Sequence, residues 1–373
     1  MSTNSWHARL AQISDLAEAK ALLEELVTEN ERLRAALETA RAVQAARPGA
    51  SSSAGPSFRD VGASRAAALD TRQVTETAML ITVSADGQAK RTAINRYSRQ
   101  RRGGIGIFDL RAADTDEARF VAVADQADAL LLLAASGRVY RVAVAAIAEA
   151  FDPRSRGEDI LAAAGVETGD RLAAILPLSE ADQQRYVLLG SQNGFIKRMR
   201  GHYFGSSFEP GRVVLDPRQT GGSACAMCLS SGTADVLMVS RGGMAARFNI
   251  SVAPLQAAPG LKLRTGDTLV GLAAIHEADS VFVVTEDGLG TRRLMEGFAA
   301  NKAPGAAGKI IMKSEAVAGV VRAPDSADLV VLTRFSKLIR FTAEEVPAKT
   351  APVQGVDIVE LRGDIVTAAA SID

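Results

Sequence analysis

Cysteine, histidine and tryptophan are scarce in this sequence. Its 373 residues include two cysteines, three histidines and one tryptophan. Two cysteines cannot build a disulfide framework, and three scattered histidines cannot build a metal cluster. No Ser–His–Asp arrangement and no paired-carboxylate cleft can be recognised. We therefore expect a protein that has no cofactor and is not an enzyme.

Excess charge of either sign and long apolar runs are also missing. Lys plus Arg and Asp plus Glu both number 43, so any basic surface must arise from the placement of cations rather than their excess. No stretch approaches 18 consecutive apolar residues, and the N-terminus lacks the pattern of a signal peptide. We therefore expect a cytoplasmic protein that does not enter a membrane.

Residues 1–46 are predicted to form a helical coiled-coil segment. Between residues 16 and 40, Leu16, Leu23, Asn30 and Leu37 fall on heptad position a. Position d is occupied by Ala19, Leu26, Leu33 and Ala40. A single Asn at position a fixes the register of parallel dimers, so this pattern indicates a homodimer. The alternative is a solitary amphipathic helix that docks on its own domain. Residues 47–72 are rich in Pro, Gly, Ser and Ala without periodicity, which predicts a flexible linker.

From residue 73 to 373 the chain repeats one pattern six times. Each unit has an apolar strand, a turn and a strand that ends in basic residues, as in "YVLLGSQNGFIKR". The turns carry Gly87, Gly137, Gly194, Gly243, Gly288 and Ser336, at spacings of 45–57 residues. An arginine follows each turn residue by four positions: Arg91, Arg141, Arg198, Arg247, Arg292 and Arg340. A β-type repeat near 50 residues predicts a propeller-like array of blades.

A second glycine follows in each unit and opens a short strand, for example "GIGIF" at Gly106 and "GVDIV" at Gly355. A third apolar strand comes next, such as "TLVGLAAI". Each blade should therefore hold about four strands. The predicted fold is all-β: a six-bladed β-pinwheel preceded by the helical segment.

The repeat resembles the C-terminal domain of the DNA gyrase A subunit, together with its topoisomerase IV counterpart. The resemblance covers residues 73–373 and is strongest at "QRRGGIG", residues 100–106. The family's heptapeptide, the gyrase A box, reads Gln-Arg-Arg-Gly-Gly-Lys-Gly. Six positions match it here: Gln100, Arg101, Arg102, Gly103, Gly104 and Gly106. Ile105 stands where the family has lysine.

This resemblance implies a six-bladed β-pinwheel whose blades exchange strands and whose rim bends or wraps duplex DNA without reading its sequence. Phosphate neutralisation by Lys and Arg would hold the DNA, and glycines would bring backbone N–H groups close to phosphates. Besides the box, the predicted DNA-binding residues are Lys90, Arg91, Arg96, Arg99, Lys197, Arg198, Arg200, Arg292, Arg293, Lys302 and Lys309. The expected partners are duplex DNA, a second copy of the chain, and gyrase or topoisomerase IV subunits. The expected location is the nucleoid.

Several alternatives remain open. "QRRGGIG" is also compatible with a glycine loop between blades that carries solvated arginines. The six repeated arginines could equally make structural hydrogen bonds to a neighbouring blade. Residues 1–72 offer no room for the family's cleavage domain, so the chain should not cut DNA by itself. It could be a protein-interaction scaffold that has lost DNA wrapping, or a split subunit that acts beside a cleavage subunit. "CAMC" at 225–228 is expected to be two buried thiols, and "GAAGK" at 305–309 is not expected to bind nucleotide.

Overall fold

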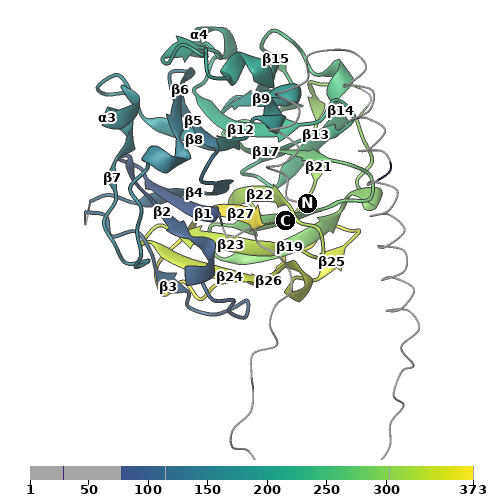
Figure 1. Ribbon diagram of the computed structural model, residues 1–373. Coiled ribbons are helices and arrows are strands. Elements are labelled where there is room, and N and C mark those ends of the chain that lie inside the picture. Colours follow the sequence, from purple (N-terminus) through teal and green to yellow (C-terminus); the bar gives the residue numbers. More distant parts are fainter. Residues whose placement is uncertain (1–27, 29–76, 114, 302, 373) are drawn as a thin grey trace, which may run out of the picture. The chain divides into compact units, whose positions relative to one another are not determined.

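A computed structural model describes residue 28, residues 77–113, 115–301 and 303–372. The predicted coiled coil and linker lie outside the described residues, apart from Thr28. The residues from 77 to 372 form sheets arranged as blades around a common centre (Figure 1). The predicted six-bladed all-β fold is confirmed. None of the helices in the described residues is long and apolar enough to cross a membrane.

Each blade is built on one antiparallel hairpin. The first strands are β1 (Ala78–Ser84), β5 (Ala129–Ala134), β9 (Tyr186–Ser191), β13 (Asp235–Ser240), β18 (Ser280–Thr285) and β23 (Asp328–Thr333). The second strands are β2 (Gln88–Ala93), β6 (Arg138–Ala143), β10 (Phe195–Arg200), β14 (Met244–Asn249), β19 (Leu289–Leu294) and β24 (Lys337–Thr342). The turn glycines have positive φ, as at Gly87 with +88°, and Ser336 takes the same conformation with +59°. The hairpin glycines were therefore predicted correctly.

An inner strand pairs with the first strand of each hairpin. The inner strands are β4 (Ala118–Asp125), β8 (Leu172–Leu178), β12 (Ala224–Ser230), β17 (Leu269–Ile275), β22 (Val317–Arg322) and β27 (Val366–Ile372). They meet around the centre of the ring, while the second hairpin strands face outward. The first hairpin strands are therefore covered on both faces and both edges, which explains their unbroken apolar runs.

A short outer strand completes each blade, and it comes from the next unit of the chain. Five of these strands are β7 (Glu158–Asp159) on blade 1, β11 (Arg212–Val213) on blade 2, β15 (Ala258–Pro259) on blade 3, β21 (Lys309–Ile310) on blade 4 and β26 (Val356–Asp357) on blade 5. The sixth, β3 (Ile107–Phe108) of the first unit, pairs with β24 of the last blade and closes the ring. We call this contact between blades 6 and 1 the closing seam.

Smaller elements connect the blades. The 3-10 turns are η1 (Ile94–Arg96), η2 (Val144–Ala146), η3 (Ala181–Gln184), η4 (Gly201–Phe204), η5 (Ile250–Val252), η6 (Met295–Gly297) and η7 (Ala343–Glu345). The remaining elements are α3 (Ile160–Ala164), α4 (Pro217–Thr220), β16 (Leu261–Lys262), β20 (Ala306–Ala307) and β25 (Ala348–Lys349).

The core consists of six apolar clusters, each shared by two neighbouring blades. Ile81 of β1 packs with Leu130 and Leu132 of β5 between blades 1 and 2. Leu80, on the other face of β1, joins Val330 of β23 at the closing seam. No blade buries its apolar faces alone, so the ring depends on its closure.

Candidate nucleic-acid interface

The gyrase A box, residues 100–106, lies on the closing seam. The Gln100 amide donates to the Arg340 carbonyl at 2.7 Å, and the Gly103 amide donates to the Ile358 carbonyl at 2.6 Å. The Gly104 carbonyl accepts a hydrogen bond from the Glu360 amide at 2.9 Å. The box is therefore fixed to the last repeat unit, more than 200 residues away in sequence.

The two arginines of the box have different environments. Arg102 is half-buried; its Nε donates to the Glu345 carbonyl at 2.7 Å and its guanidinium also reaches the Asp357 carbonyl at 3.1 Å. Arg101 is exposed and makes no side-chain contact of this kind with the described residues. Arg99, just before the box, pairs with the buried carboxylate of Asp328 at 2.9 Å. Of these three arginines, Arg101 presents its charge most openly to solvent.

The box glycines do not form the expected backbone cradle for an anion. The Gly103 amide is already bonded to Ile358, and the Gly104 amide lies 3.3 Å from the Arg101 carbonyl, to which it donates. A Cβ at Gly106 would lie 2.9 Å from the Leu338 carbonyl oxygen, and its φ is +77°. The glycines therefore allow close backbone packing across the seam.

Replacing Gly106 by alanine should destabilise the ring. We expect Gly106→Ala to lower the free energy of unfolding by about 1–3 kcal/mol, because it combines left-handed strain with a clash against backbone. Gly103→Ala is the matched control, since its φ is +78° but its nearest contact is 3.9 Å away. Denaturant unfolding should rank Gly106→Ala well below Gly103→Ala; equal stabilities would contradict this packing role.

Two predicted contact residues, Lys90 and Arg91, lie inside the ring. The Lys90 side chain is completely buried, and its Nζ lies 2.6 Å from Asp109 Oδ1 and 2.7 Å from the Pro153 carbonyl. Burial lowers the pKa of Lys90, and Asp109 opposes that shift. Arg91 is 6% exposed. These two side chains have no access to a phosphate, which corrects the expectation from sequence.

The repeated arginine makes the same inter-blade contact in five of the six units. Its guanidinium donates to a carbonyl in or next to the 3-10 turn of the following blade. The bonds are Arg91 to Ile147 (2.9 Å), Arg198 to Ile250 (2.7 Å), Arg247 to Met295 (2.8 Å), Arg292 to Val346 (2.9 Å) and Arg340 to Tyr97 (3.0 Å). The structural alternative for these residues is therefore the one observed.

The other predicted cations divide between interior and surface. Arg293 is buried and donates to the Gly297 carbonyl at 3.1 Å, so it too is withdrawn from the contact surface. Lys197 is half-buried, donates to the Val214 carbonyl at 2.7 Å, and has its pKa lowered by burial and then by Arg212. Arg200 is exposed over the Tyr186 ring, and Lys309 is exposed with Nζ 2.6 Å from the Ala299 carbonyl. Lys302 lies outside the described residues.

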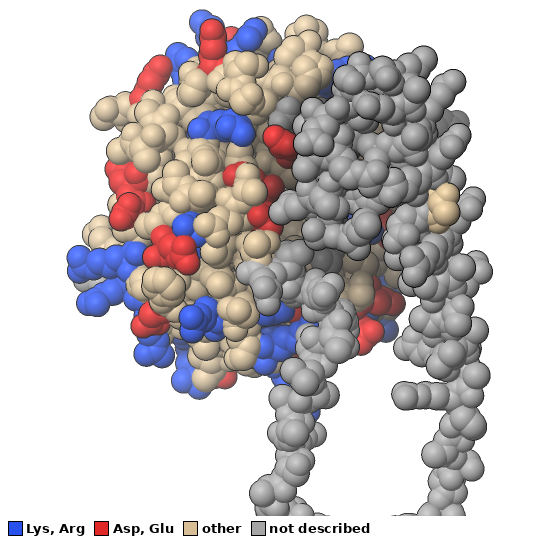
Figure 2. All heavy atoms as spheres, in the orientation of Figure 1, with Lys and Arg blue, Asp and Glu red and all other residues tan. Residues whose placement is uncertain are grey.

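Three exposed arginines that sequence reasoning missed lie beside the closing seam. Arg111 follows β3, and its amide donates to the Ser155 carbonyl at 3.0 Å. This bond brings Arg154 and Arg156 of the loop before β7 next to the first unit. We call the exposed arginines of these segments the basic edge: Arg96, Arg101, Arg111, Arg154 and Arg156. In Figure 2, blue side chains gather along this side of the ring, with some acids among them.

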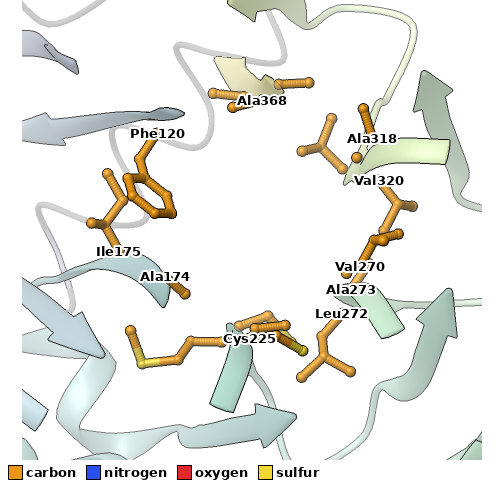
Figure 3. A pocket seen from close by; sticks show the side chains of 18 of the residues that line it. Phe120, Ala174, Ile175, Cys225, Val270, Leu272, Ala273, Ala318, Val320 and Ala368 are labelled. Atoms are coloured by element: carbon orange, nitrogen blue, oxygen red, sulfur yellow. The ribbon is translucent and has the colours of Figure 1, made fainter. Parts of the chain in front are cut away.

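A cavity of about 1230 Å³ lies at the centre of the ring (Figure 3). Inner-strand side chains such as Phe120, Ile175, Leu272 and Val320 line it. Cys225 and Cys228 also line it; both are free thiols, and burial raises the pKa of each to about 12. The described residues include no group of His, Cys, Asp and Glu that could hold a metal.

The strand order, the exchanged outer strands and the box on the closing seam define a six-bladed β-pinwheel. The family model described as "DNA gyrase C-terminal domain, beta-propeller" matches residues 78–125, 185–202, 234–276 and 327–373. The pinwheel is therefore related to the C-terminal domain of the DNA gyrase A protein, as its sequence suggested.

Individual relatives support this assignment. The DNA gyrase A protein of Chlamydia trachomatis is 27% identical over 308 residues, which are 79% of this chain and 37% of the relative. The chain thus spans little more than a third of that relative. A solved DNA gyrase A C-terminal domain matches with a TM-score of 0.67 at 20% identity, over 79% of this chain and all of the other. The C-terminal domain of DNA topoisomerase IV matches with a TM-score of 0.55 at 18% identity, over 80% of this chain and 94% of the other.

Proposed function

We propose that the pinwheel binds duplex DNA without sequence preference and bends it along the basic edge, with no catalytic step of its own. The observation that carries the proposal is the sorting of charge around the box. Between residues 96 and 111, Arg96, Arg101 and Arg111 are exposed, whereas the one acid, Asp109, is 1% exposed. Arg154 and Arg156 extend this surface from a second loop.

The chemistry of these groups suits phosphate contact. Guanidinium groups on a convex edge neutralise phosphates and release counterions, which favours binding of any duplex sequence. Exposed cations also lie on or near the other outer strands: Arg212, Lys262, Arg264, Lys309, Lys313 and Lys349. A bent duplex that follows the rim would meet them in turn, and these contacts would offset the cost of bending.

A gel-shift series with a random duplex tests the proposal. We expect binding at low salt that weakens steeply between about 50 and 200 mM, with a competitor of different sequence equally effective. No shift at low salt, or a salt-independent shift, would sink the proposal. Ligation of nicked circles in the presence of the protein would report bending or wrapping separately, through a change in the linking number of the products.

Ile105 offers a gain-of-function prediction. Its side chain is 37% exposed at the box, where the related family has lysine. Ile105→Lys should add about one phosphate contact, so the slope of log affinity against log salt should steepen by about 0.9. Ile105→Gln is the uncharged control and should leave the slope unchanged. If Ile105→Lys altered neither binding nor wrapping, the box would have no part in DNA contact.

A protein-interaction scaffold is the second candidate, and the acids of the rim favour it. Exposed carboxylates lie near the other outer strands: Glu158, Asp159, Glu209, Glu344, Asp357 and Glu360. They would repel phosphates and suit a basic protein partner. The gel shift separates the candidates, because a scaffold would retain no duplex at low salt.

The proposed assembly is a homodimer formed through residues 16–40, which would raise avidity for DNA by joining two sites. Sedimentation equilibrium of the full chain would test it. Association with topoisomerase subunits remains part of the proposal, and co-purification with a cleavage subunit would reveal it.

A further inference from the structure

The closing seam is polar at a position where the other five seams are apolar. In every unit, the residue after the exchanged strand donates its amide to the carbonyl of a turn residue in the blade that receives the strand. The donors in the other units are Ile160, Val214, Leu261, Ile311 and Ile358, all buried. In the first unit it is Asp109, which donates to Ser336 and is 1% exposed.

Two neighbours of Asp109 depart from the repeat in the same way. Lys90 lies three residues after its turn glycine, where the other units have Tyr140, Lys197, Ala246, Thr291 and Ile339. Tyr97 ends η1, where other 3-10 turns end in Ile147, Ala253, Phe298 or Val346. The blade that carries the box is therefore the one in which this combination of polar groups enters the core.

These groups form one buried cluster. Asp109 Oδ1 accepts hydrogen bonds from Lys90 Nζ at 2.6 Å and from the Tyr97 hydroxyl at 2.5 Å. Asp109 Oδ2 accepts from the Thr82 hydroxyl at 2.5 Å. Lys90 Nζ also donates to the Pro153 carbonyl at 2.7 Å. Both carboxylate oxygens are therefore satisfied, and burial together with Asp109 raises the pKa of Tyr97, which keeps its hydroxyl as a donor.

The cluster joins the segments that carry the basic edge. Tyr97 and Asp109 stand at the two ends of the segment that contains the box. Pro153 belongs to the loop that carries Arg154 and Arg156, and the Arg111–Ser155 backbone bond lies beside it. One ammonium group thus contacts both ends of the box segment and the neighbouring loop.

We propose that Lys90, Tyr97 and Asp109 are positioning residues for the basic edge: their buried cluster holds the box segment and the loop 151–157 in the arrangement that meets DNA. This inference rests on the proposed function. A buried ion pair adds little net stability over an apolar pair of similar volume, because desolvation offsets the attraction. An aliphatic side chain would fill the seam but could not fix the Pro153 carbonyl.

The test replaces the pair with apolar residues, Lys90→Met/Asp109→Leu. The net charge is unchanged, so any loss of DNA affinity comes from geometry. We expect DNA binding about tenfold weaker in low salt and a shallower salt dependence, since fewer arginines reach phosphates together. Amides of residues 98–106 and 151–157 should exchange hydrogen faster. Wild-type affinity together with wild-type exchange in a folded double variant would overturn the inference.

Two further variants keep the result interpretable. Ile311→Ala opens a cavity at the equivalent position of the seam between blades 4 and 5, and it should lower Tm without changing DNA binding or exchange near the box. Tyr97→Phe removes one hydroxyl and serves if the double variant does not fold; it should speed exchange in the box segment, and unchanged exchange would contradict the inference. If the wild type itself bound no DNA, the proposed function would fail while the exchange measurements still reported on the cluster.

Discussion

Arg340→Ala should be the most destabilising single arginine substitution at the closing seam, with a loss of about 3 kcal/mol in the free energy of unfolding. The Arg340 side chain is buried, and its Nη2 lies 2.6 Å from Asp328 Oδ2. It also donates to the Ile94 and Tyr97 carbonyls of the first blade, at 3.2 and 3.0 Å. Truncation leaves these buried acceptors with fewer donors, although Arg99 still contacts Asp328.

Chemical denaturation of two variants checks this result. Arg340→Lys keeps the charge but loses the planar fork of donors, so its stability should fall between wild type and alanine. Arg362→Ala is the surface control: Arg362 pairs with Glu360 in the open and should contribute less than about 1 kcal/mol. A loss at Arg340 no larger than that at Arg362 would show that the inter-blade contact does not stabilise the ring.

Removing the basic edge should have the largest effect on DNA binding. We expect Arg101→Ala/Arg154→Ala/Arg156→Ala to weaken binding about 100-fold near 100 mM salt and to reduce the salt slope by about 2–3, because up to three phosphate contacts are lost. These side chains are exposed, so the fold should survive their truncation.

The matched control removes the same charge elsewhere. Arg185, Arg218 and Arg362 are exposed and pair with Asp182, Asp216 and Glu360. Their triple replacement by alanine changes the net charge equally, so it isolates the role of position from that of total charge. Similar losses in the two triple variants would mean that DNA responds only to net charge, and that the basic edge is not a site.

The repeat made the blades predictable, because hairpins depend on local signals. The turn at Gly87 needs a positive φ, and the apolar run of β1 follows from burial on both faces. The exchange of outer strands entered only through family resemblance. A strand as short as Ile107–Phe108 has no periodicity of its own, and its partner lies in the last unit.

The contact surface was harder to predict than the fold. Lys90 and Arg91 read as surface cations, because strand alternation does not reveal that a blade is covered on both faces. The partner that neutralises Lys90 is Asp109, which stands beyond the box and reaches it only when the ring closes. Conversely, Arg154 and Arg156 are remote in sequence and join the box through the Arg111–Ser155 contact. Single-sequence patterns contain neither relationship.

The closing strand also sets the order of events during synthesis. Ile107 pairs with Leu338, so the box segment leaves the ribosome roughly 230 residues before its partner. At about 5–20 residues per second, the nascent chain waits roughly 10–50 s with this edge unpaired. Early blades can stack meanwhile, but the box gains its anchor only when the sixth hairpin emerges. Competence for DNA would thus be acquired late in translation, and a truncated product that lacks the last unit would not acquire it.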